Sequence, residues 1–396
     1  MFNLEAIQKA LREFKFDGWL LYDFHGSNTI ARRILDISAD AHTTRRFFYY
    51  IPAEGEPTKL NHRIETEVLS HLPGRRRLYL RWQEFEEELG KILSGAGRIA
   101  MEYSRRNAIP YVSVVDGGTI DLVKGCGARV ESSGDLIQLF EAVIDDDQWS
   151  SHLEAERHLL TACSQAWQFI AAQVKEGKKP HETEIQSHIM DYFEKNDLFT
   201  DHPPIVGVGP NSGNPHYAPG PLTDSEVGKG DFILIDLWCR LKKPRAIFAD
   251  YTRVGFVGES VPQKYTEIFN IVAKARDAAI YLVRNSLLEE KKLRGWEVDN
   301  AARNVIEEAG YGEKFIHRTG HNIAQDLHGN GTHIDNLETH DERLLLPRTC
   351  FSIEPGIYLD EFGVRSEVNV YIDENSHVHV TGDPQSEVLP ILKAWG

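Results

Sequence analysis

The chain is poor in cysteine, with four among 396 residues and no two of them in a C-x-x-C pair. This spacing argues against a disulfide framework or a zinc ribbon, which both need grouped thiols. Scattered thiols are typical of a reducing compartment, so we expect a cytoplasmic protein. Long apolar runs are also absent, and the N-terminal segment mixes charged with apolar residues. We therefore expect neither a membrane-spanning helix nor a secretory signal peptide.

Positive charge is scarce as well. The sequence has 44 Lys and Arg residues against 60 Asp and Glu residues, which gives a formal net charge of −16. Nucleic acids and anionic membranes attract basic surfaces, so this balance argues against both as partners. A hydrophobic share of 41% and an aromatic share of 10% are typical of a folded globular protein. The acidic surplus leaves carboxylates available for metal sites.

The first part of the chain alternates helix and strand patterns. Apolar residues at helical spacing predict an N-terminal helix, and EFEEELGKIL predicts another over 84–93. Short apolar runs predict strands over 18–23, 47–51, 77–82 and 98–103. This alternation indicates a small α/β domain. Three consecutive aspartates then precede a long helix that Ser150 or Ser151 can cap, so we predict an N-terminal domain over 1–148 and a second domain over 149–396.

The second part of the chain repeats one order of elements twice. In each half, two helices are followed by strands, which suggests an internal structural repeat with a pseudo-twofold axis. The predicted helices are 151–176, 182–195, 263–285 and 296–309, and the predicted strands are 232–238, 246–257, 349–359 and 363–372.

Each half also places two carboxylates within apolar strands. Asp236 and Asp250 lie on either side of a basic, proline-containing turn, and Glu354 and Glu367 lie on either side of an acidic turn that contains Gly363. An acid within an apolar strand is costly unless it is paired or bound to metal. Four converging carboxylates repel one another unless cations neutralise them. The pattern therefore predicts a site for two divalent ions.

Histidines between the halves can complete such a site. The segment HRTGHNIAQDLHG offers His317, His321 and His328, and spacing does not decide which of them binds metal. One histidine added to four oxygen ligands suits manganese, cobalt or zinc. A fourth histidine, His216, lies in a segment rich in Gly, Pro and Asn, which we expect to be a loop.

With these motifs, residues 151–396 resemble the pita-bread metallopeptidases, which include the Xaa-Pro dipeptidases (prolidases), aminopeptidase P, methionine aminopeptidase and creatinase. The matching stretches are LIDLW, FADYTR, HRTGHNIAQDLHG, SIEPGIY and GVRSEVN. Their ligand order of Asp, Asp, His, Glu, Glu is the one found in that family. The N-terminal part looks like the smaller creatinase-type domain. The resemblance implies a pita-bread fold for the second domain and a homodimer.

The resemblance assigns roles to individual residues. Asp236 would bind one metal, Asp250 and Glu367 would bridge both, and His321 and Glu354 would complete the second. Glu354 would also accept a proton from the attacking water. The residues that match family positions around the substrate are His216, His317, His328, Tyr358 and Arg365.

The sequence departs from the family pattern near these ligands. The segment between Asp236 and Asp250 is longer than usual, and Trp238 stands where relatives have Gly. Smaller departures are Ala249, Ala324, Gly329 and Val368. None of these departures removes a ligand, but the longer segment and Trp238 bear on substrate preference.

We predict a dinuclear-metal peptidase, most simply an Xaa-Pro dipeptidase with manganese, that acts on small peptides. Aminopeptidase P, which removes the first residue of longer Xaa-Pro peptides, is the nearest alternative. A non-peptide amidohydrolase and a metal-free binding protein of the same fold are two further ones.

Overall fold

The computed structural model describes residues 2–38 and 40–395. The chain divides into two compact units, Met1–Glu141 (unit 1) and Ala142–Gly396 (unit 2). The long helix at the start of unit 2 begins earlier than predicted. Asp145, rather than Ser150 or Ser151, is its N-cap. The Asp145 carboxylate accepts a hydrogen bond from the backbone N–H of Gln148, and the side-chain oxygen of Gln148 accepts one from the backbone N–H of Asp145.

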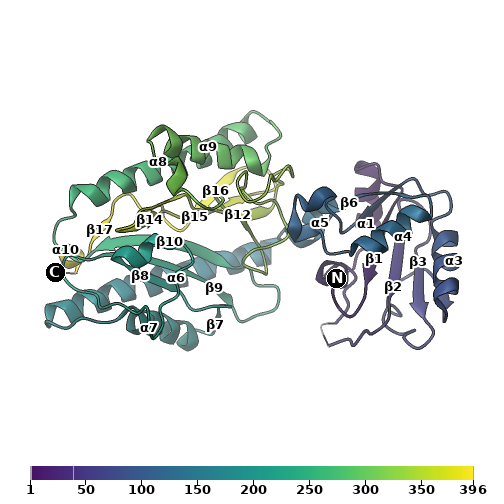
Figure 1. Ribbon diagram of the computed structural model, residues 1–396, viewed down its shortest axis with the longest axis horizontal. Helices are drawn as coiled ribbons and strands as arrows, with labels where there is room; N and C mark the ends of the chain where they lie inside the picture. Colours follow the sequence, from purple (N-terminus) through teal and green to yellow (C-terminus); the bar gives the residue numbers. More distant parts are fainter. Residues whose placement is uncertain (1, 39, 396) are drawn as a thin grey trace. The chain divides into compact units, whose positions relative to one another are not determined.

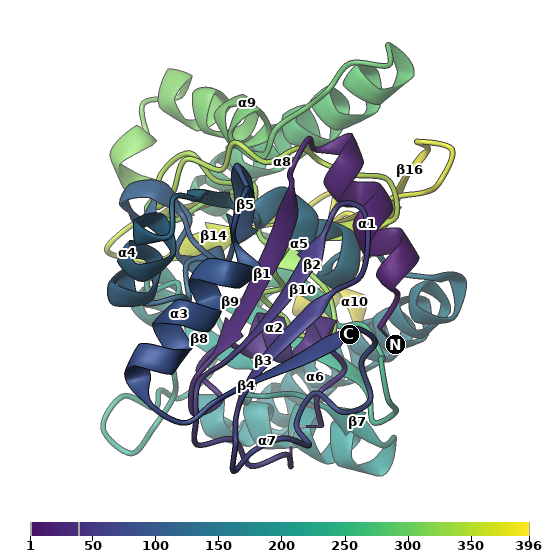
Figure 2. The ribbon, with the colours of Figure 1, turned by 90° about the vertical axis from the view of Figure 1, so that its right-hand side faces the viewer.

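Unit 1 is a mixed sheet covered on both faces (Figure 2). The strand order is β4-β3-β2-β1-β5-β6, and β1 is parallel to β5 but antiparallel to β2. The strands are β1 (Gly18–Asp23), β2 (Phe47–Pro52), β3 (Thr58–His62), β4 (Arg75–Tyr79), β5 (Arg98–Met101) and β6 (Arg129–Ser132). The helices are α1 (Leu4–Glu13), α2 (Thr29–Ile34), α3 (Trp82–Ile92), α4 (Gly117–Gly125) and α5 (Gly134–Glu141).

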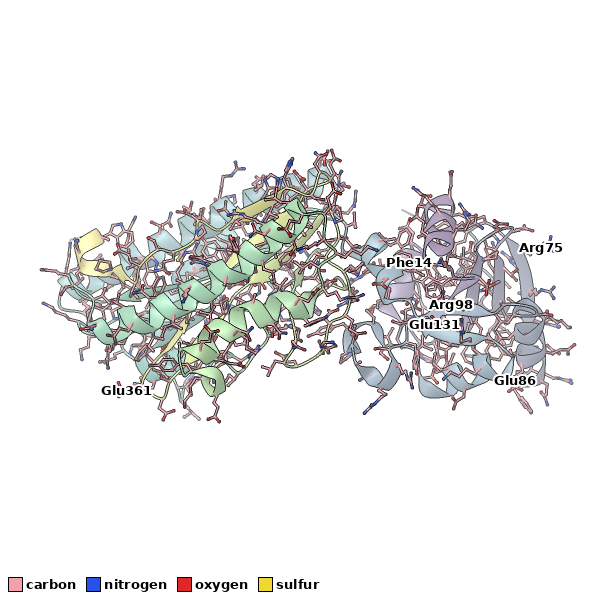
Figure 3. The ribbon with its side chains drawn as sticks, turned by 90° about the horizontal axis from the view of Figure 1, so that it is seen from above. Phe14, Arg75, Glu86, Arg98, Glu131 and Glu361 are labelled. Atoms are coloured by element: carbon pink, nitrogen blue, oxygen red, sulfur yellow. The ribbon has the colours of Figure 1, made fainter. Side chains whose placement is uncertain are left out.

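Successive side chains of β1 point to opposite faces of the sheet, so they contribute to two separate core clusters in unit 1. Trp19 and Leu21 pack with α1, α2 and α5, whereas Leu20 and Tyr22 pack with α3 and α4. Arg98 of β5 joins Glu131 of β6 through two hydrogen bonds, of 3.0 and 2.5 Å, between neighbouring parallel strands (Figure 3).

Unit 2 contains the predicted repeat (Figure 1). Helices α6 and α7 precede the antiparallel pair β9 and β10, and α8 and α9 precede β12 to β15. The helices are α6 (Asp146–Lys175), α7 (Glu182–Lys195), α8 (Gln263–Leu288), α9 (Gly295–Glu308) and α10 (Ile391–Ala394). The strands are β7 (Leu198–Phe199), β8 (Ile205–Val208), β9 (Phe232–Leu241), β10 (Ala249–Phe256), β11 (Asn322–Ile323), β12 (Thr349–Ile353), β13 (Gly356–Tyr358), β14 (Gly363–Arg365), β15 (Val368–Ile372), β16 (Val378–Thr381) and β17 (Leu389–Pro390).

Alternation along β9 and β10 decides where their acids lie. Ile233, Ile235 and Leu237 pack against α6 and α7. Phe232 and Leu234 pack on the opposite face with α8 and the strands of the second half. Asp236 continues this second face, since it lies two residues after Leu234.

The second hairpin differs from the prediction. Each of its two predicted strands is broken at its glutamate, so that β12 and β13 flank Glu354-Pro355, and β14 and β15 flank Ser366-Glu367. Strand β12 pairs with β15, and β13 pairs with β14. Pro355 has no backbone N–H to donate to a ladder, which explains the first break. The segment expected to be a loop before His216 instead begins with strand β8.

Among the described residues, no helix has both the length and the apolar character needed to cross a membrane.

Candidate metal centre

The hairpin of β9 and β10 brings the two aspartates onto one face. Asp236 lies opposite Thr252, and Asp250 lies opposite Trp238, so the two acids are diagonal neighbours in the ladder. Both are buried. The predicted meeting of two inward-facing aspartates is therefore present in the fold.

Three side chains from distant segments form a compact group. Ligand atoms of Asp250, His321 and Glu367 all lie within 4.8 Å of one another, and all three residues are buried. His321 Nε2 is 3.4 Å from Asp250 Oδ2 and 3.4 Å from Glu354 Oε1, so Glu354 adjoins the same group.

Local packing brings His321 to this place. A Cβ atom on Gly320 would lie 2.0 Å from the Ser352 carbonyl oxygen, so only glycine allows this close approach to β12. The backbone N–H of His321 donates to the Ser352 hydroxyl at 2.9 Å, and the same hydroxyl donates to Glu354 Oε1 at 3.1 Å. Ser352 thus links the histidine to the glutamate.

Two carboxylate oxygens of the group have no hydrogen-bond partner in the described structure. They are Asp250 Oδ1 and Glu367 Oε1, and both are buried. A buried carboxylate oxygen without a donor is costly, and a bound cation removes that cost. Three oxygen-bearing side chains and one imidazole are also the donor set of a borderline-hard divalent ion. The residues present therefore fit a metal site.

The electrostatics of the group support this fit. Burial, together with the charges of Asp236 and Glu354, raises the pKa of Asp250 well above its usual range. Burial and the neighbouring acids likewise raise the pKa of Glu367. Burial and Asp236 raise the pKa of Glu354 to about 7, although Arg365 and Arg318 oppose the shift. Burial keeps the pKa of His321 well below its ordinary value, so the ring is neutral and can act as a ligand.

Asp236 is held differently from the other acids. Its Oδ2 accepts a hydrogen bond from Arg365 Nη2 at 2.5 Å, and its Oδ1 lies 3.1 Å from the Thr252 hydroxyl. Arg365 also donates to Thr252 Oγ1 and to the Tyr358 hydroxyl, at 2.8 and 3.0 Å. Asp236 is therefore not part of the compact group, although it adjoins Glu367 through Thr252.

The remaining predicted histidines surround this centre. His317 Nε2 lies 2.7 Å from the Tyr358 hydroxyl, and burial with the Arg365 charge lowers the pKa of His317 to about 3. The rings of His321 and His328 are 4.1 Å apart. His328 is reachable by solvent, yet desolvation by the surrounding protein, with the Arg318 charge, lowers its pKa to about 4. The charge of His216, which is exposed, acts on both His317 and His328.

Sequence reasoning missed several residues of the site. Thr252 is fully buried and joins Asp236, Glu367 and Arg365. The Asn369 side chain forms two hydrogen bonds with the backbone of Asp250. Its oxygen accepts one from the Asp250 N–H, and its amide group donates one to the Asp250 carbonyl oxygen. Thr252 lies two residues after Asp250 in a strand, so alternation could have placed it on the same face.

The end of the longer segment between the aspartates is packed into the protein. Phe248 and Ile247 are buried, the Phe248 N–H donates to Ala324 at 3.1 Å, and His152 Nδ1 lies 2.7 Å from the Phe248 carbonyl oxygen. The residues just before Asp250 are therefore a fixed part of unit 2, whereas the turn residues 242–245 are exposed.

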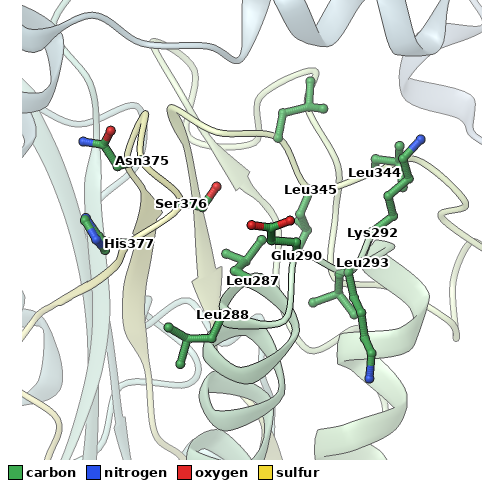
Figure 4. Close-up of a pocket in the computed structure, with 12 residues that line it drawn as sticks. Leu287, Leu288, Glu290, Lys292, Leu293, Leu344, Leu345, Asn375, Ser376 and His377 are labelled. Atoms are coloured by element: carbon green, nitrogen blue, oxygen red, sulfur yellow. The ribbon is translucent and has the colours of Figure 1, made fainter.

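A cavity of about 550 Å³ lies elsewhere on unit 2 (Figure 4). Its walls include Leu287 and Leu288 from the end of α8, Leu345, and His377 in the turn between β15 and β16. None of the predicted site residues lines it.

Comparison with known proteins shows the family of this chain. The model of metallopeptidase family M24 matches residues 154–374. The chain is 31% identical over 213 residues to an Xaa-Pro dipeptidase of Pyrococcus furiosus, a match that covers 53% of this chain and 55% of that protein. It is also 31% identical over 186 residues to a probable dipeptidase PepE of Mycobacterium tuberculosis, covering 47% of this chain and 45% of that protein. The chain thus spans about half the length of these relatives.

Solved structures show the same fold over nearly the whole chain. Dipeptidase PepE of Mycobacterium ulcerans superposes with a TM-score of 0.70 at 22% identity, covering 98% of this chain and 96% of that one. A dipeptidase of Pyrococcus horikoshii superposes with a TM-score of 0.62 at 24% identity, covering 98% and 99%. The expected pita-bread fold is confirmed, and the chain belongs to metallopeptidase family M24.

Proposed function

We propose that this protein is a metal-dependent exopeptidase that hydrolyses the bond before proline in Xaa-Pro dipeptides. The observation that carries this proposal is the buried group of Asp250, His321 and Glu367, with two carboxylate oxygens that have no hydrogen-bond partner among the described residues. The dipeptidase and Xaa-Pro dipeptidase names of the relatives support the substrate class.

Five side chains would hold two divalent ions, with manganese the first choice and cobalt or zinc the alternatives. Asp250 and Glu367 would be shared, Asp236 would bind one ion, and His321 with Glu354 would bind the other. Each carboxylate oxygen has two lone pairs, so Asp236 can accept a hydrogen bond from Arg365 and still act as a ligand. Bound ions of this kind acidify a water molecule and polarise a carbonyl group.

Glu354 would accept and return the proton during hydrolysis. Its Oε1 accepts a hydrogen bond from Ser352, and its Oε2 lies 3.9 Å from Arg365 Nε. These contacts orient the carboxyl group and leave it beside His321. A proton that it takes from water can then pass to the nitrogen of the leaving proline.

The surrounding side chains would bind and orient the peptide. His328 is neutral and next to His321, so its ring N–H can donate to the developing oxyanion. His216 would hold the bound peptide. The contacts of His317 and Arg365 with the Tyr358 hydroxyl fix the direction of both groups toward the substrate. Proline needs such a dedicated site, because its nitrogen carries no hydrogen and its ring fixes φ.

A hydrolysis panel tests the proposal. The protein is stripped of metal, supplied with manganese, cobalt or zinc, and assayed on Ala-Pro, Ala-Pro-Ala and Ala-Ala. Metal-dependent cleavage of Ala-Pro alone supports the proposal. Preference for the tripeptide identifies the aminopeptidase P alternative, and no metal-dependent cleavage refutes both. The homodimer and the cytoplasmic location stay predictions from the sequence.

A further inference from the structure

Trp238 lies on the strand face that carries the metal-centre aspartates. It follows Asp236 by two residues and lies directly opposite Asp250 in the β9–β10 ladder. The indole is therefore a direct cross-strand neighbour of Asp250.

The indole holds a second acid near the centre. Trp238 Nε1–H donates to Asp201 Oδ1 at 2.6 Å. Asp201 belongs to the short segment between β7 and β8, and its side chain is 45% exposed. It is therefore fixed in position yet reachable by a ligand from solvent.

The Asp201 charge acts on the centre itself. Burial is the main cause of the raised pKa of Asp250, and Asp201 adds to it. At His328, Asp201 opposes the lowering of the pKa that desolvation and Arg318 produce. Asp201 is thus close enough to influence both a ligand and a substrate-facing histidine.

Other charges near Asp201 leave this region acidic. The Arg240 guanidinium lies 4.3 Å from the Phe199 ring centroid, and both Asp201 and Asp326 act on it. His202 Nδ1 is 3.5 Å from Asp201 Oδ2, and the His202 side chain is 78% exposed. The charges of Asp201 and Asp326 together exceed that of Arg240 by one negative charge.

We propose that Asp201, positioned by Trp238, is a specificity-determining residue that favours a cationic side chain on the residue before proline. This inference rests on the proposed dipeptidase function. Every Xaa-Pro dipeptide has the same α-ammonium group and the same proline, so only the side chain of the first residue can distinguish substrates by charge. A lysine side chain places its ammonium group at the end of a flexible four-carbon stem, which suits a carboxylate that lies beyond the ligands.

The test compares kcat/KM for Lys-Pro, Met-Pro and Glu-Pro with the manganese-loaded protein. We expect kcat/KM to decrease from Lys-Pro to Met-Pro to Glu-Pro. In D201N, the ratio of Lys-Pro to Met-Pro should fall about threefold to fivefold, as is typical of a partly exposed charge pair. In W238F, which keeps the ring but loses the N–H donor, the ratio should fall less, in the same direction. The E308Q variant removes an exposed acid from the end of α9 and should leave every ratio unchanged.

Salt gives a readout that a merely structural role would not move. The Lys-Pro preference of the wild type should decrease as salt is raised from about 0.01 M to about 1 M, because screening shortens the reach of an exposed charge. D201N should lack this dependence. Two results overturn the inference and leave the proposed function standing, provided that the wild type hydrolyses Met-Pro. The first is a wild-type preference for Glu-Pro. The second is a ratio of Lys-Pro to Met-Pro that neither D201N nor salt changes. Failure of the wild type to cleave any Xaa-Pro peptide overturns the proposed function and this inference with it.

Discussion

Glu102 in unit 1 and Glu367 in unit 2 are both buried glutamates, but their surroundings differ. Glu102 accepts hydrogen bonds from Trp19 Nε1, Asn28 Nδ2 and the Ser133 hydroxyl, at 2.7, 2.8 and 3.1 Å. Glu367 faces the acids Asp250, Glu354 and Asp236, and its Oε1 has no hydrogen-bond partner in the described structure.

The difference distinguishes a structural acid from a candidate metal ligand. Donors from β1, from the N-cap of α2 and from the residue after β6 surround Glu102, so its burial is stabilised within the protein itself. The acids of unit 2 raise the pKa values of one another, and their free oxygens point to a cation that the polypeptide does not provide. Burial alone therefore does not indicate a metal site, whereas buried acids without donors mark a candidate one.

Removing a ligand should have the largest effect. Asp250→Asn keeps the shape of the side chain but removes its charge, so we expect kcat/KM to fall by about 10³-fold or more, which is about 4 kcal/mol. Metal analysis should show loss of bound ion. The metal-free variant should unfold at a higher temperature than the metal-free wild type, because one buried charge is gone. Asp191→Asn, at an exposed position of α7, is the matched control. Near-native turnover of Asp250→Asn would refute the site.

Removing the structural acid should act on stability instead. Glu102→Ala leaves the N–H of Trp19 and one of the two Asn28 amide hydrogens without an acceptor, while the Asn28 amide still donates to the Tyr22 carbonyl oxygen. We expect a loss of about 3 kcal/mol in the free energy of unfolding of unit 1. Hydrogen exchange of the β1 amides measures this loss. Glu102→Gln, which keeps an acceptor oxygen, should cost less, and equal stability of Glu102→Ala and wild type would contradict the assignment.

Metal should stabilise only one of the two units. At a manganese concentration of about 100 times Kd, unit 2 should gain about 2.7 kcal/mol by mass action. Hydrogen exchange should slow in β10 and β15, which flank the ligands, and stay unchanged in β1 and β5. Asp250→Asn serves as the control that binds less metal. Equal protection of both units would contradict the comparison.

The smallest effect concerns pH. Burial raises the pKa of Glu102 from 4.5 to about 6, so the folded state binds a proton more tightly than the unfolded state. Stability from this group is present below about pH 4.5 and is lost as pH rises through about 6, by about 2 kcal/mol at 1.36 kcal/mol per pKa unit. The stability difference between wild type and Glu102→Gln at pH 4 and at pH 7 measures it.

Glu65 gives the opposite sign in the same unit. Burial opposes its ionisation, but hydrogen bonds from Thr44 and Arg45 outweigh that effect and lower its pKa. The difference between wild type and Glu65→Gln should therefore favour the wild type more as pH rises. If the stability differences for Glu102→Gln and Glu65→Gln changed in the same direction with pH, the contrast between these two glutamates would be contradicted.

Strongly patterned elements were predictable from the sequence. The expected helices over 182–195 and 263–285 correspond to α7 and α8, and the run GWLLYD is β1. Elements with weak patterns were missed. Helix α4 begins with two glycines, and β3 contains Asn61 and Lys59, so their local patterns are weak. The Asp116 N-cap and the packing of Ile120 stabilise α4, and pairing with β2 and β4 together with the packing of Leu60 stabilises β3.

The sequence by itself determined that two aspartates share one strand face. Alternation along β9 and β10 places Asp236 and Asp250 there. Glu354 and Glu367 lie outside the strands, so the pairing of β12 with β15 and of β13 with β14, rather than alternation, places them. Only the tertiary structure decided which histidine joins them, because His321 reaches the acids through the close approach of Gly320 to Ser352. It also decided that Asp236 binds Arg365 and that Trp238 holds Asp201. These contacts join segments far apart in the chain. A local sequence pattern does not predict which distant side chain a given residue will contact.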